Sequence, residues 1–337
     1  MKYPKNNLTK NQKNEVMRFN SSREFAYEDL NCINCDLSNS KKLYDNDRYG
    51  ILQKTVMCNN CGLVYSNPRM NEESLKNFYS SNLYRELYEK EGNFEHGFIL
   101  RKEEINKEIV IKKPNFDKYY SQLFIDFIAN TNINYNSVCE LGAGYGTNLI
   151  YFNKLGKKTF GLEPSIKLAE IANKNKINIK QGFIHDLKDT YDIIVLKHVF
   201  EHLHDPIKDL KKIKNHTNNY LYLEVPGNVK RIASIQNAHN FYFTENTLNK
   251  IVCESGFDIV EIKYCKDNEF ILALYRKSQD KTKNFNYNYI HEVKKIKKIY
   301  KNDNIRFFIS KILKTLKIYN FLIPFRKLAL KILRLDN

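Results

Sequence analysis

The most informative part of the sequence is VCELGAGYGTN, residues 138–148. Three of the chain's 12 glycines stand here at alternate positions, Gly142, Gly144 and Gly146, and Glu140 precedes the first by two residues. Glycine lets the backbone turn tightly and a ligand come close, and the start of a following helix offers free N–H groups. A dinucleotide loop, G-x-G-x-x-G, needs glycine at Thr147. The stretch therefore predicts a ligand-binding turn and speaks against a nicotinamide-dependent enzyme.

Two acids beside this turn indicate what the ligand is. Glu140 suits a ligand with an ammonium group, which a carboxylate holds directly or through water. Glu163 ends the next predicted strand, 23 residues later, where a carboxylate lies beside a bound ribose and accepts from its hydroxyls. The two acids together predict a nucleoside that carries an amino acid tail.

An alternation of strand-like and helix-like segments surrounds the turn, and it is typical of an α/β sheet with crossover helices. Expected helices cover 116–130, 146–156, 165–176, 205–217 and 244–256. Expected strands cover 137–143, 157–164, 177–182, 191–199, 220–226, 257–265 and 270–277, the last two as a hairpin.

Four stretches, VCELGAGYG, FGLEPS, QGFIHDL and YDIIVLKHVFEHLHDP, resemble in this order the class I S-adenosylmethionine (SAM) dependent methyltransferases. The resemblance covers about residues 115–277. It implies a Rossmann-like sheet of seven, mostly parallel strands with SAM as the cofactor. From the methionyl group through the ribose to the adenine, the implied contacts are Gly142, Gly144 and Gly146, then Glu163, then Phe183 and Ile184.

The resemblance also places His198 where the fourth strand meets the methionine end of SAM. A histidine packed in the core is the alternative interpretation of His198. Glu201 and His202 are interpreted as structural residues that fix the loop before Asp205, the residue that begins the next helix.

Two C-x-x-C pairs, CINC and CNNC, predict a metal site of four thiolates: Cys32, Cys35, Cys58 and Cys61. Two residues between cysteines let both sulfurs reach one ion, and two such turns complete a tetrahedron around Zn²⁺. The 22 residues between the pairs slightly exceed the common zinc-ribbon spacing. With four protein ligands and no open position, the zinc is expected to be structural. The remaining cysteines, Cys139, Cys253 and Cys265, are expected to fill the core.

A zinc segment ahead of this body resembles bacterial methyltransferases that modify sugars and cell-surface polysaccharides. Their histidine signature has a counterpart in AHNFYFTENTL, which implies His239 as the general base, with Tyr65 and Tyr242 as pocket walls. A histidine that only packs in its loop is the alternative. Sugar C-methyltransferases carry a further α/β domain, whereas only about 60 residues follow here, so methylation of an oxygen fits at least as well.

The chain divides into five expected segments. Within the third, Asn71 or Ser74 is expected to begin a helix whose aromatics, Phe78, Tyr79, Tyr84 and Tyr88, form a packing face or a pocket wall. The segments are a flexible lead-in at 1–30, a zinc-binding domain at 31–66, a helical linker or cap at 67–114, the methyltransferase domain at 115–278 and a basic helical tail at 279–337.

The net charge of +17 is concentrated in the tail. Residues 281–337 hold 15 Lys and Arg against 3 Asp and Glu, a net +12, which leaves 40 against 35, or +5, for residues 1–280. Apolar residues at helical spacing, first over 305–316 and again after Pro324, predict basic amphipathic helices that lie on anionic lipid. Docking on the body or on a second subunit is the alternative.

These features predict an enzyme that methylates a small molecule or a glycan: a sugar, a nucleotide-sugar or a polysaccharide substituent. The absence of a signal-like or membrane-spanning stretch predicts a cytoplasmic protein, attached at most to the inner membrane face. A zinc-containing RNA methyltransferase is the first alternative, although the near-neutral body and the KHVFEHLHDP turn speak against nucleic acid. A non-catalytic scaffold is the second. The acceptor's identity and the oligomeric state stay open.

Overall fold

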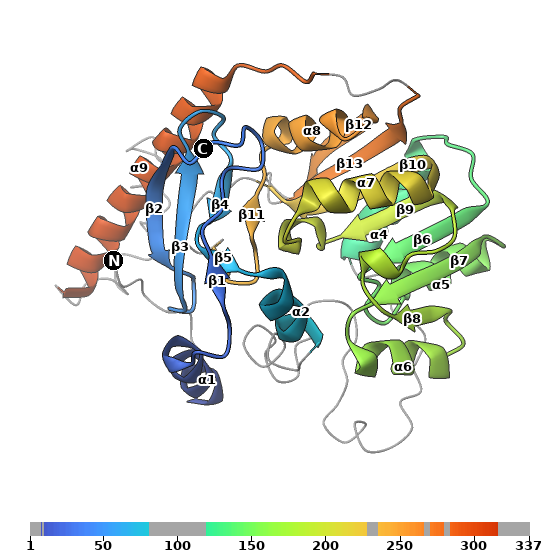
Figure 1. Ribbon diagram of the computed structural model, residues 1–337, viewed down its shortest axis with the longest axis horizontal. Coiled ribbons are helices and arrows are strands. Elements are labelled where there is room, and N and C mark those ends of the chain that lie inside the picture. Colours follow the sequence, from blue (N-terminus) through green and yellow to red (C-terminus); the bar gives the residue numbers. More distant parts are fainter. Residues whose placement is uncertain are drawn as a thin grey trace.

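The computed structural model describes residues 8, 10–80, 119–227, 235–265, 270–279 and 284–315. Two sheets dominate this part of the chain, a larger one formed after residue 136 and a smaller one formed mainly before residue 67 (Figure 1). The sequence pattern predicts the first closely and the second only in outline.

The larger sheet of the described chain has seven strands in the order β12-β13-β10-β9-β6-β7-β8. All neighbouring pairs from β10 to β8 are parallel, and β13 runs antiparallel to both β10 and β12. This confirms the predicted Rossmann-like, mostly parallel sheet. The strands are β6 (Ser137–Leu141), β7 (Lys158–Glu163), β8 (Ile179–Gln181), β9 (Tyr191–Lys197), β10 (Thr217–Pro226), β12 (Phe257–Cys265) and β13 (Phe270–Lys277).

Helices cover both faces of this sheet because successive side chains of a buried strand point to opposite sides. Cys139 and Ile194 belong to the core on the side of α7 (Pro206–His216) and α8 (Glu245–Glu254). Val138 and Ile193 belong to the core on the other side. The helices there are α4 (Tyr119–Asn130), α5 (Thr147–Lys154) and α6 (Ile166–Lys174).

Local signals set the helix starts as the sequence predicts. Asp205 accepts from the N–H of Lys208 at the start of α7. Thr244 and Thr247 bond each other's backbone N–H in a reciprocal capping arrangement at the start of α8. Of the two candidates for the start of α2 (Glu72–Ser80), it is Asn71 whose side chain accepts from the N–H of Ser74.

The smaller sheet has the order β11-β4-β3-β2 among the described residues. β2 (Ser40–Asn46) and β3 (Leu52–Cys58) form the hairpin between the two cysteine pairs, and β4 (Val64–Ser66) follows the second pair. Its edge strand, β11 (Phe241–Tyr242), comes from the chain after β10 and pairs antiparallel with β4. The zinc-binding segment and the methyltransferase body therefore share a sheet and do not stand apart as two independent units.

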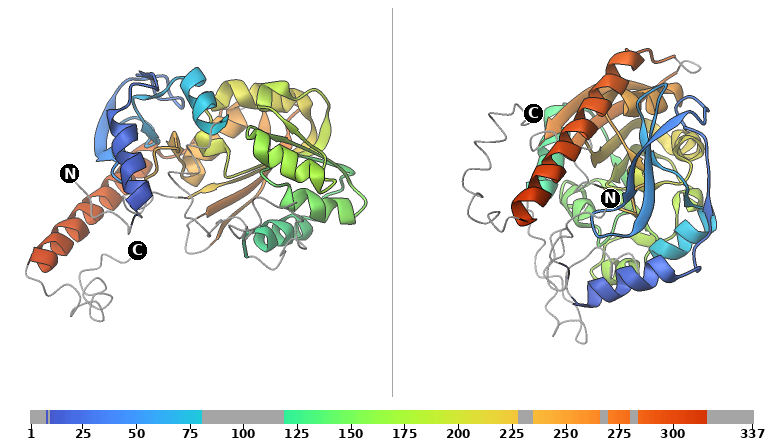
Figure 2. Two further views of the ribbon diagram at one scale, coloured as in Figure 1. Left: turned by 90° about the horizontal axis from the view of Figure 1, so that it is seen from below. Right: turned by 90° about the vertical axis from the view of Figure 1, so that its left-hand side faces the viewer.

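The first part of the basic tail docks on this smaller sheet. Helix α9 (Tyr289–Thr315) runs along its outer side (Figure 2), where Val293 and Ile296 pack into a core with Tyr44 and Val64. The hydroxyl of Tyr44 also donates to Asp303 across 3.0 Å. Residues 289–303 therefore dock on the body, ahead of the two stretches for which the sequence predicts amphipathic helices. The second predicted amphipathic stretch, after Pro324, lies outside the described residues.

Residues 10–28 of the lead-in contain a helix and a short strand, whereas the sequence predicts a flexible segment. Residues Lys10–Ser21 form helix α1, in which Val16 and Phe19 are buried against Phe78 of α2. Short strands β1 (Tyr27–Glu28) and β5 (Arg69–Met70) then pair with each other. Only a few residues of this helix are apolar and buried, and most of the others are polar. The sequence of the segment therefore shows no clear helical period of apolar residues. Residues 81–118, which hold most of the predicted linker with Tyr84 and Tyr88, lie outside the described residues.

None of the described helices has an apolar stretch long enough to cross a membrane.

Candidate active site

The glycine turn after β6 has the backbone geometry that its sequence predicts. Gly142, Gly144 and Gly146 have φ angles of 71°, 56° and 72°, the left-handed region that side chains rarely adopt. A Cβ at Gly142 would lie 2.4 Å from Cγ2 of Val199, and one at Gly144 would meet no described atom within 4 Å. The turn is thus packed against the residue after His198 at one end and open at its centre.

Glu163, at the end of β7, bonds directly to this turn. Its Oε2 accepts from the N–H of Gly144 at 2.8 Å, and its Oε1 accepts from the N–H of Ser165 at 3.0 Å. The parallel register of β6 with β7 brings the two strand ends together. The acid that the sequence analysis assigns to the ribose therefore lies at the open centre of the glycine turn.

Glu140 is buried one residue before the end of β6, with 3% of its surface exposed. Its Oε1 accepts from Nδ2 of Asn148 in α5 at 2.6 Å, whereas its Oε2 has no hydrogen-bond partner among the described residues. Burial raises the pKa of Glu140 to about 7, against the opposing effect of the Asn148 bond. One oxygen thus ties strand to helix, and the other is left to accept from a ligand or a water.

The two residues predicted to flank an adenine follow β8 in a short 3₁₀ turn, η1 (Ile184–Asp186). The N–H of Phe183 donates to Asp186 at 2.9 Å, which fixes the start of the turn. Ile184 is buried, and the ring of Phe183 stacks on His185 with centroids 5.8 Å apart. One apolar side chain and one partly exposed aromatic face thus lie at the neighbouring strand end.

His198 follows β9 in a left-handed conformation, with φ of 53°, which is uncommon outside glycine. Its Nε2 lies 3.0 Å from Oε1 of Glu224 on β10, and its Nδ1 lies 3.7 Å from Oε1 of Glu201. Burial favours the neutral ring, but the bonds and charges of Glu201 and Glu224 outweigh it and raise the pKa of His198 to about 9. His198 therefore bridges two carboxylates.

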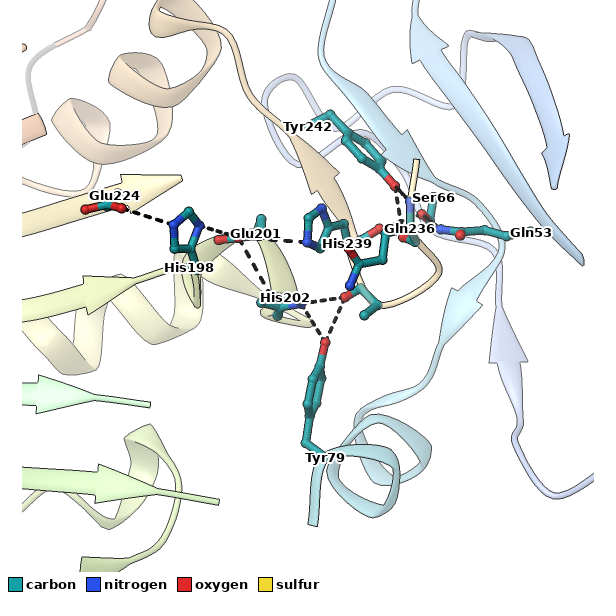
Figure 3. A network of polar contacts seen from close by, with 11 residues as sticks. Gln53, Ser66, Tyr79, His198, Glu201, His202, Glu224, Gln236, His239 and Tyr242 are labelled. Atoms are coloured by element: carbon teal, nitrogen blue, oxygen red, sulfur yellow. Dashed lines mark hydrogen bonds and ion pairs between the residues drawn. The ribbon is translucent and has the colours of Figure 1, made fainter. Parts of the chain in front are cut away.

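His239 lies close to His202 and Glu201, which the sequence analysis treats separately (Figure 3). The rings of His202 and His239 are 4.7 Å apart between centroids, and their Nε2 atoms lie 3.7 and 4.0 Å from Oε1 of Glu201. Burial lowers the pKa of His202 below its usual value. Burial, with the neighbouring His202, lowers the pKa of His239 well below its usual value. Both imidazoles are therefore neutral at physiological pH.

Asn240 holds the two loops of this cluster together. Its N–H donates to the carbonyl of Glu201 at 2.9 Å, and its Nδ2 donates to the carbonyls of His202 and Leu203. Its own carbonyl accepts from the N–H of Ser66 on β4 at 2.9 Å. The asparagine is part of the AHNFYF stretch, yet nothing in the sequence shows that it bonds to the loop after β9.

The two tyrosines predicted as pocket walls, Tyr65 and Tyr242, are buried in the protein interior. Tyr65, on β4, is buried in a core cluster that also includes residues of the larger sheet, and its backbone pairs with Phe241. The hydroxyl of Tyr242 bonds both the N–H and the carbonyl of Gln236 at 3.0 Å. Tyr79 of α2 is the aromatic that reaches the histidine cluster, with its hydroxyl 2.6 Å from Nδ1 of His202.

The four cysteines of the two C-x-x-C pairs come together as their spacing predicts, and their sulfurs all lie within 4.8 Å of one another. Cys32 and Cys61 are 3.5 Å apart at Sγ, and Cys35 and Cys58 are 3.4 Å apart. A tetrahedron of sulfurs 2.3 Å from Zn²⁺ has edges of about 3.8 Å, so this geometry fits a zinc ion with little adjustment. The remaining three cysteines are buried, as expected of core residues.

Residues 115–262 match the family model described as a methyltransferase domain. No curated protein matches the chain by sequence. Among solved structures, magnesium protoporphyrin IX methyltransferase from Synechocystis PCC 6803 is 17% identical, with 47% of this chain and 81% of that chain covered and a TM-score of 0.40. A SAM-dependent methyltransferase from Clostridium acetobutylicum ATCC 824 is 13% identical, with 52% and 97% covered and a TM-score of 0.41. The glycopeptide N-methyltransferase MtfA is 13% identical, with 45% and 92% covered and a TM-score of 0.39.

The family match includes, at least in part, six of the seven strands of the larger sheet, all but β13. The family match and the strand order of the described residues agree on a Rossmann-like methyltransferase fold.

Proposed function

We propose that this protein transfers a methyl group from SAM to a hydroxyl group of a small molecule or a glycan. The observation that carries the proposal is the pairing of Glu163 with the N–H of Gly144 at 2.8 Å. It joins a carboxylate to an open glycine turn at the carboxyl ends of adjacent parallel strands, where ligands bind in open α/β sheets.

Each part of SAM has a matching group in this proposal. Glu163 accepts from the ribose hydroxyls, and Phe183 with Ile184 flanks the adenine. The glycine turn lets the backbone approach the methionyl part, near the unpartnered Oε2 of Glu140. SAM supplies an electrophilic methyl group on a sulfonium.

Positioning accounts for most of the rate of such a transfer, since it is an in-line displacement that needs the acceptor atom held close to the methyl carbon. The loop of residues 198–203 lies next to the glycine turn, because Val199 closely approaches Gly142, and Asn240 bonds the turn before β11 to this loop. His239 lies in the turn before β11 with a neutral ring, which a general base requires.

Burial favours a small acceptor, or one sugar unit of a glycan, over a broad nucleic-acid surface. The side chains of His198, His202 and His239 are 19%, 12% and 11% exposed. A small group reaches such largely buried side chains more easily than the surface of a folded nucleic acid does.

We also propose that Zn²⁺ at the four cysteines is structural. The zinc-binding residues belong to the same segment as β3 and β4, so the ion stabilises the sheet that presents β11 and the turn with His239.

The test is incubation of the purified, zinc-loaded protein with methyl-labelled SAM and cell extracts separated into nucleotide-sugar, lipid-linked glycan and RNA fractions. The proposal expects label in a sugar-containing fraction. Label confined to RNA would move the assignment to the first alternative, and no label in any fraction would favour a non-catalytic scaffold.

A further inference from the structure

We propose that Glu201, His202 and His239 bind a divalent transition-metal ion at the acceptor end of the site, separate from the four-cysteine zinc site. The inference deepens the proposed methyl transfer and rests on it for the ion's role. Its starting point is that one carboxylate oxygen and one ring nitrogen from each histidine all lie within 4.8 Å of one another (Figure 3).

The orientation of His202 is fixed by its other ring nitrogen. Nδ1 lies 2.7 Å from the carbonyl oxygen of Ala238, and a carbonyl oxygen only accepts, so Nδ1 carries the proton. The hydroxyl of Tyr79 donates to the same carbonyl at 2.8 Å and accepts from Nδ1. Nε2 therefore carries a lone pair that faces Glu201. Metal-binding histidines are held in this way, with the second N–H donated to a carbonyl.

Glu201 faces that lone pair with a carboxylate that is almost fully buried, with 1% of its surface exposed. Neither of its oxygens has a hydrogen-bond partner in the part of the chain that the structure describes. Burial of a carboxylate is costly, and His198, whose Nδ1 lies 3.7 Å from Oε1, offsets only part of that cost. A cation between this carboxylate and Nε2 of His202, which lie 3.7 Å apart, would offset more of it and would bind both groups.

His239 completes the set from a different part of the chain. Its Nε2 lies 4.0 Å from Oε1 of Glu201, and its backbone is fixed by bonds from His239 N–H to Gln236 and from Ser66 Oγ to the His239 carbonyl. Ligands about 2.1 Å from one ion lie roughly 3.0–3.5 Å apart. The observed separations of 3.7 and 4.0 Å thus need only small side-chain movements to close around an ion.

His198 belongs to the surroundings of the site and is not one of its ligands. Its Nε2 is engaged by Glu224 at 3.0 Å, and its Nδ1 points toward the carboxylate of Glu201. It therefore orients Glu201 and links it to β10, as residues behind a metal ligand commonly do.

Two histidines and one carboxylate leave coordination positions open, as in catalytic metal sites and unlike the four-cysteine site. We place an acceptor hydroxyl at an open position, where the ion lowers the pKa of the hydroxyl. The hydroxyl proton passes to solvent, the oxygen bonds to the methyl carbon, and the electron pair of the broken carbon–sulfur bond stays on sulfur. His239 then acts as a metal ligand, in place of the general base that the sequence analysis predicts.

The test uses the full chain with one zinc per chain already at the four cysteines. Mn²⁺ alone is titrated in and followed by the loss of its free-ion EPR signal, with Zn²⁺ uptake measured in parallel, because Mn²⁺ prefers nitrogen and oxygen ligands over thiolates. We expect one further ion per chain. Glu201→Gln, which preserves shape, and His239→Ala should each weaken binding at least about tenfold, or about 1.4 kcal/mol.

The matched control is His204→Ala, which lies on the same loop but pairs with Glu28 at 2.7 Å, outside the cluster. It should bind the ion as the wild type does. The inference is overturned if neither ion binds beyond the first zinc, or if binding survives both substitutions. SAM binding measured on the same samples separates the two proposals, because its absence overturns the proposed function whatever the metal result. A His239→Ala protein that binds metal normally but has lost turnover would return His239 to the role of base.

Discussion

Gly144 and Glu163 meet across 2.8 Å, backbone N–H to carboxylate, although they are 19 positions apart in the chain. The contact exists because parallel strands β6 and β7 end at the same edge of the sheet, and because a residue without a side chain stands at the centre of the turn. Both the proposed cofactor site and the proposed metal site are arranged along this edge, since Val199 joins the glycine turn to the loop with Glu201.

Substitution of Gly142 should cost more stability than substitution of a matched glycine. Gly142→Ala imposes a left-handed alanine, about 1–2 kcal/mol, and an overlap with Val199, about 1–3 kcal/mol more. Gly156 has the same φ of 71° with no described atom within 4 Å of an added Cβ, so Gly156→Ala should cost only the first amount. Urea unfolding of both variants measures the difference, and equal losses would contradict the close packing at Gly142.

Binding of SAM should release protons near neutral pH. Burial raises the pKa of Glu140 to about 7, so the folded protein holds this proton over a pH range in which the unfolded chain has lost it. The resulting stability is present below about pH 4.5 and is lost as the pH rises through about 7. An ammonium group on the ligand favours the ionised carboxylate and displaces the proton.

Calorimetry at pH 7 in buffers of different ionisation enthalpy measures this proton release. Glu140→Gln should abolish the buffer dependence, while Asn148 keeps its partner on α5. If the heat of SAM binding to the wild type does not depend on the buffer, Glu140 does not release its proton when the ligand binds.

Loss of one zinc ligand should destabilise the smaller sheet. Cys58→Ser is expected to lower the zinc content by about one equivalent and the free energy of unfolding by at least about 2 kcal/mol, since structural zinc contributes on the order of 10 kcal/mol to folding. Cys253→Ser, a buried cysteine on α8, is the control and should keep the zinc. Metal analysis with thermal unfolding tests this, and full zinc content in Cys58→Ser would contradict a four-thiolate site.

The tail beyond the docked part of α9 should bind anionic membranes. A chain that ends after Asp303 keeps the contacts with Tyr44 and Val64 but loses the basic residues that follow. The full chain is expected to sediment with vesicles that contain phosphatidylglycerol and not with neutral vesicles, because surface-bound helices depend on charge. Equal sedimentation of both chains would assign the tail to protein contacts only.

The sequence predicts the larger sheet well because each of its elements carries its own local signal. Glycines mark the turn after β6, Asp205 and Thr244 mark helix starts, and runs of apolar residues mark the buried strands. The four cysteines are equally predictable, since their spacing alone encodes a metal site.

The remaining features depend on contacts between distant parts of the chain. The pairing of β11 with β4 joins residues more than 170 positions apart, and no local pattern records it. The same holds for Asn240 and for the bond between His202 and Ala238, which turn two residues interpreted as structural, Glu201 and His202, into a candidate metal site. The resemblance to known methyltransferases identifies His239 as a candidate site residue. Only the fold shows that Glu201 and His202 lie beside it.

Calorimetric titration of the zinc-loaded full chain with SAM, and with its demethylated product, measures whether the glycine turn and Glu163 bind the cofactor. We predict one site per chain, weakened about 10- to 100-fold by Glu163→Ala because charge-assisted hydrogen bonds contribute about 1.5–3 kcal/mol. Folded wild-type protein that binds neither compound would contradict the proposed cofactor site at the glycine turn and Glu163. A Glu163→Ala variant that binds both compounds as tightly as the wild type would contradict it as well.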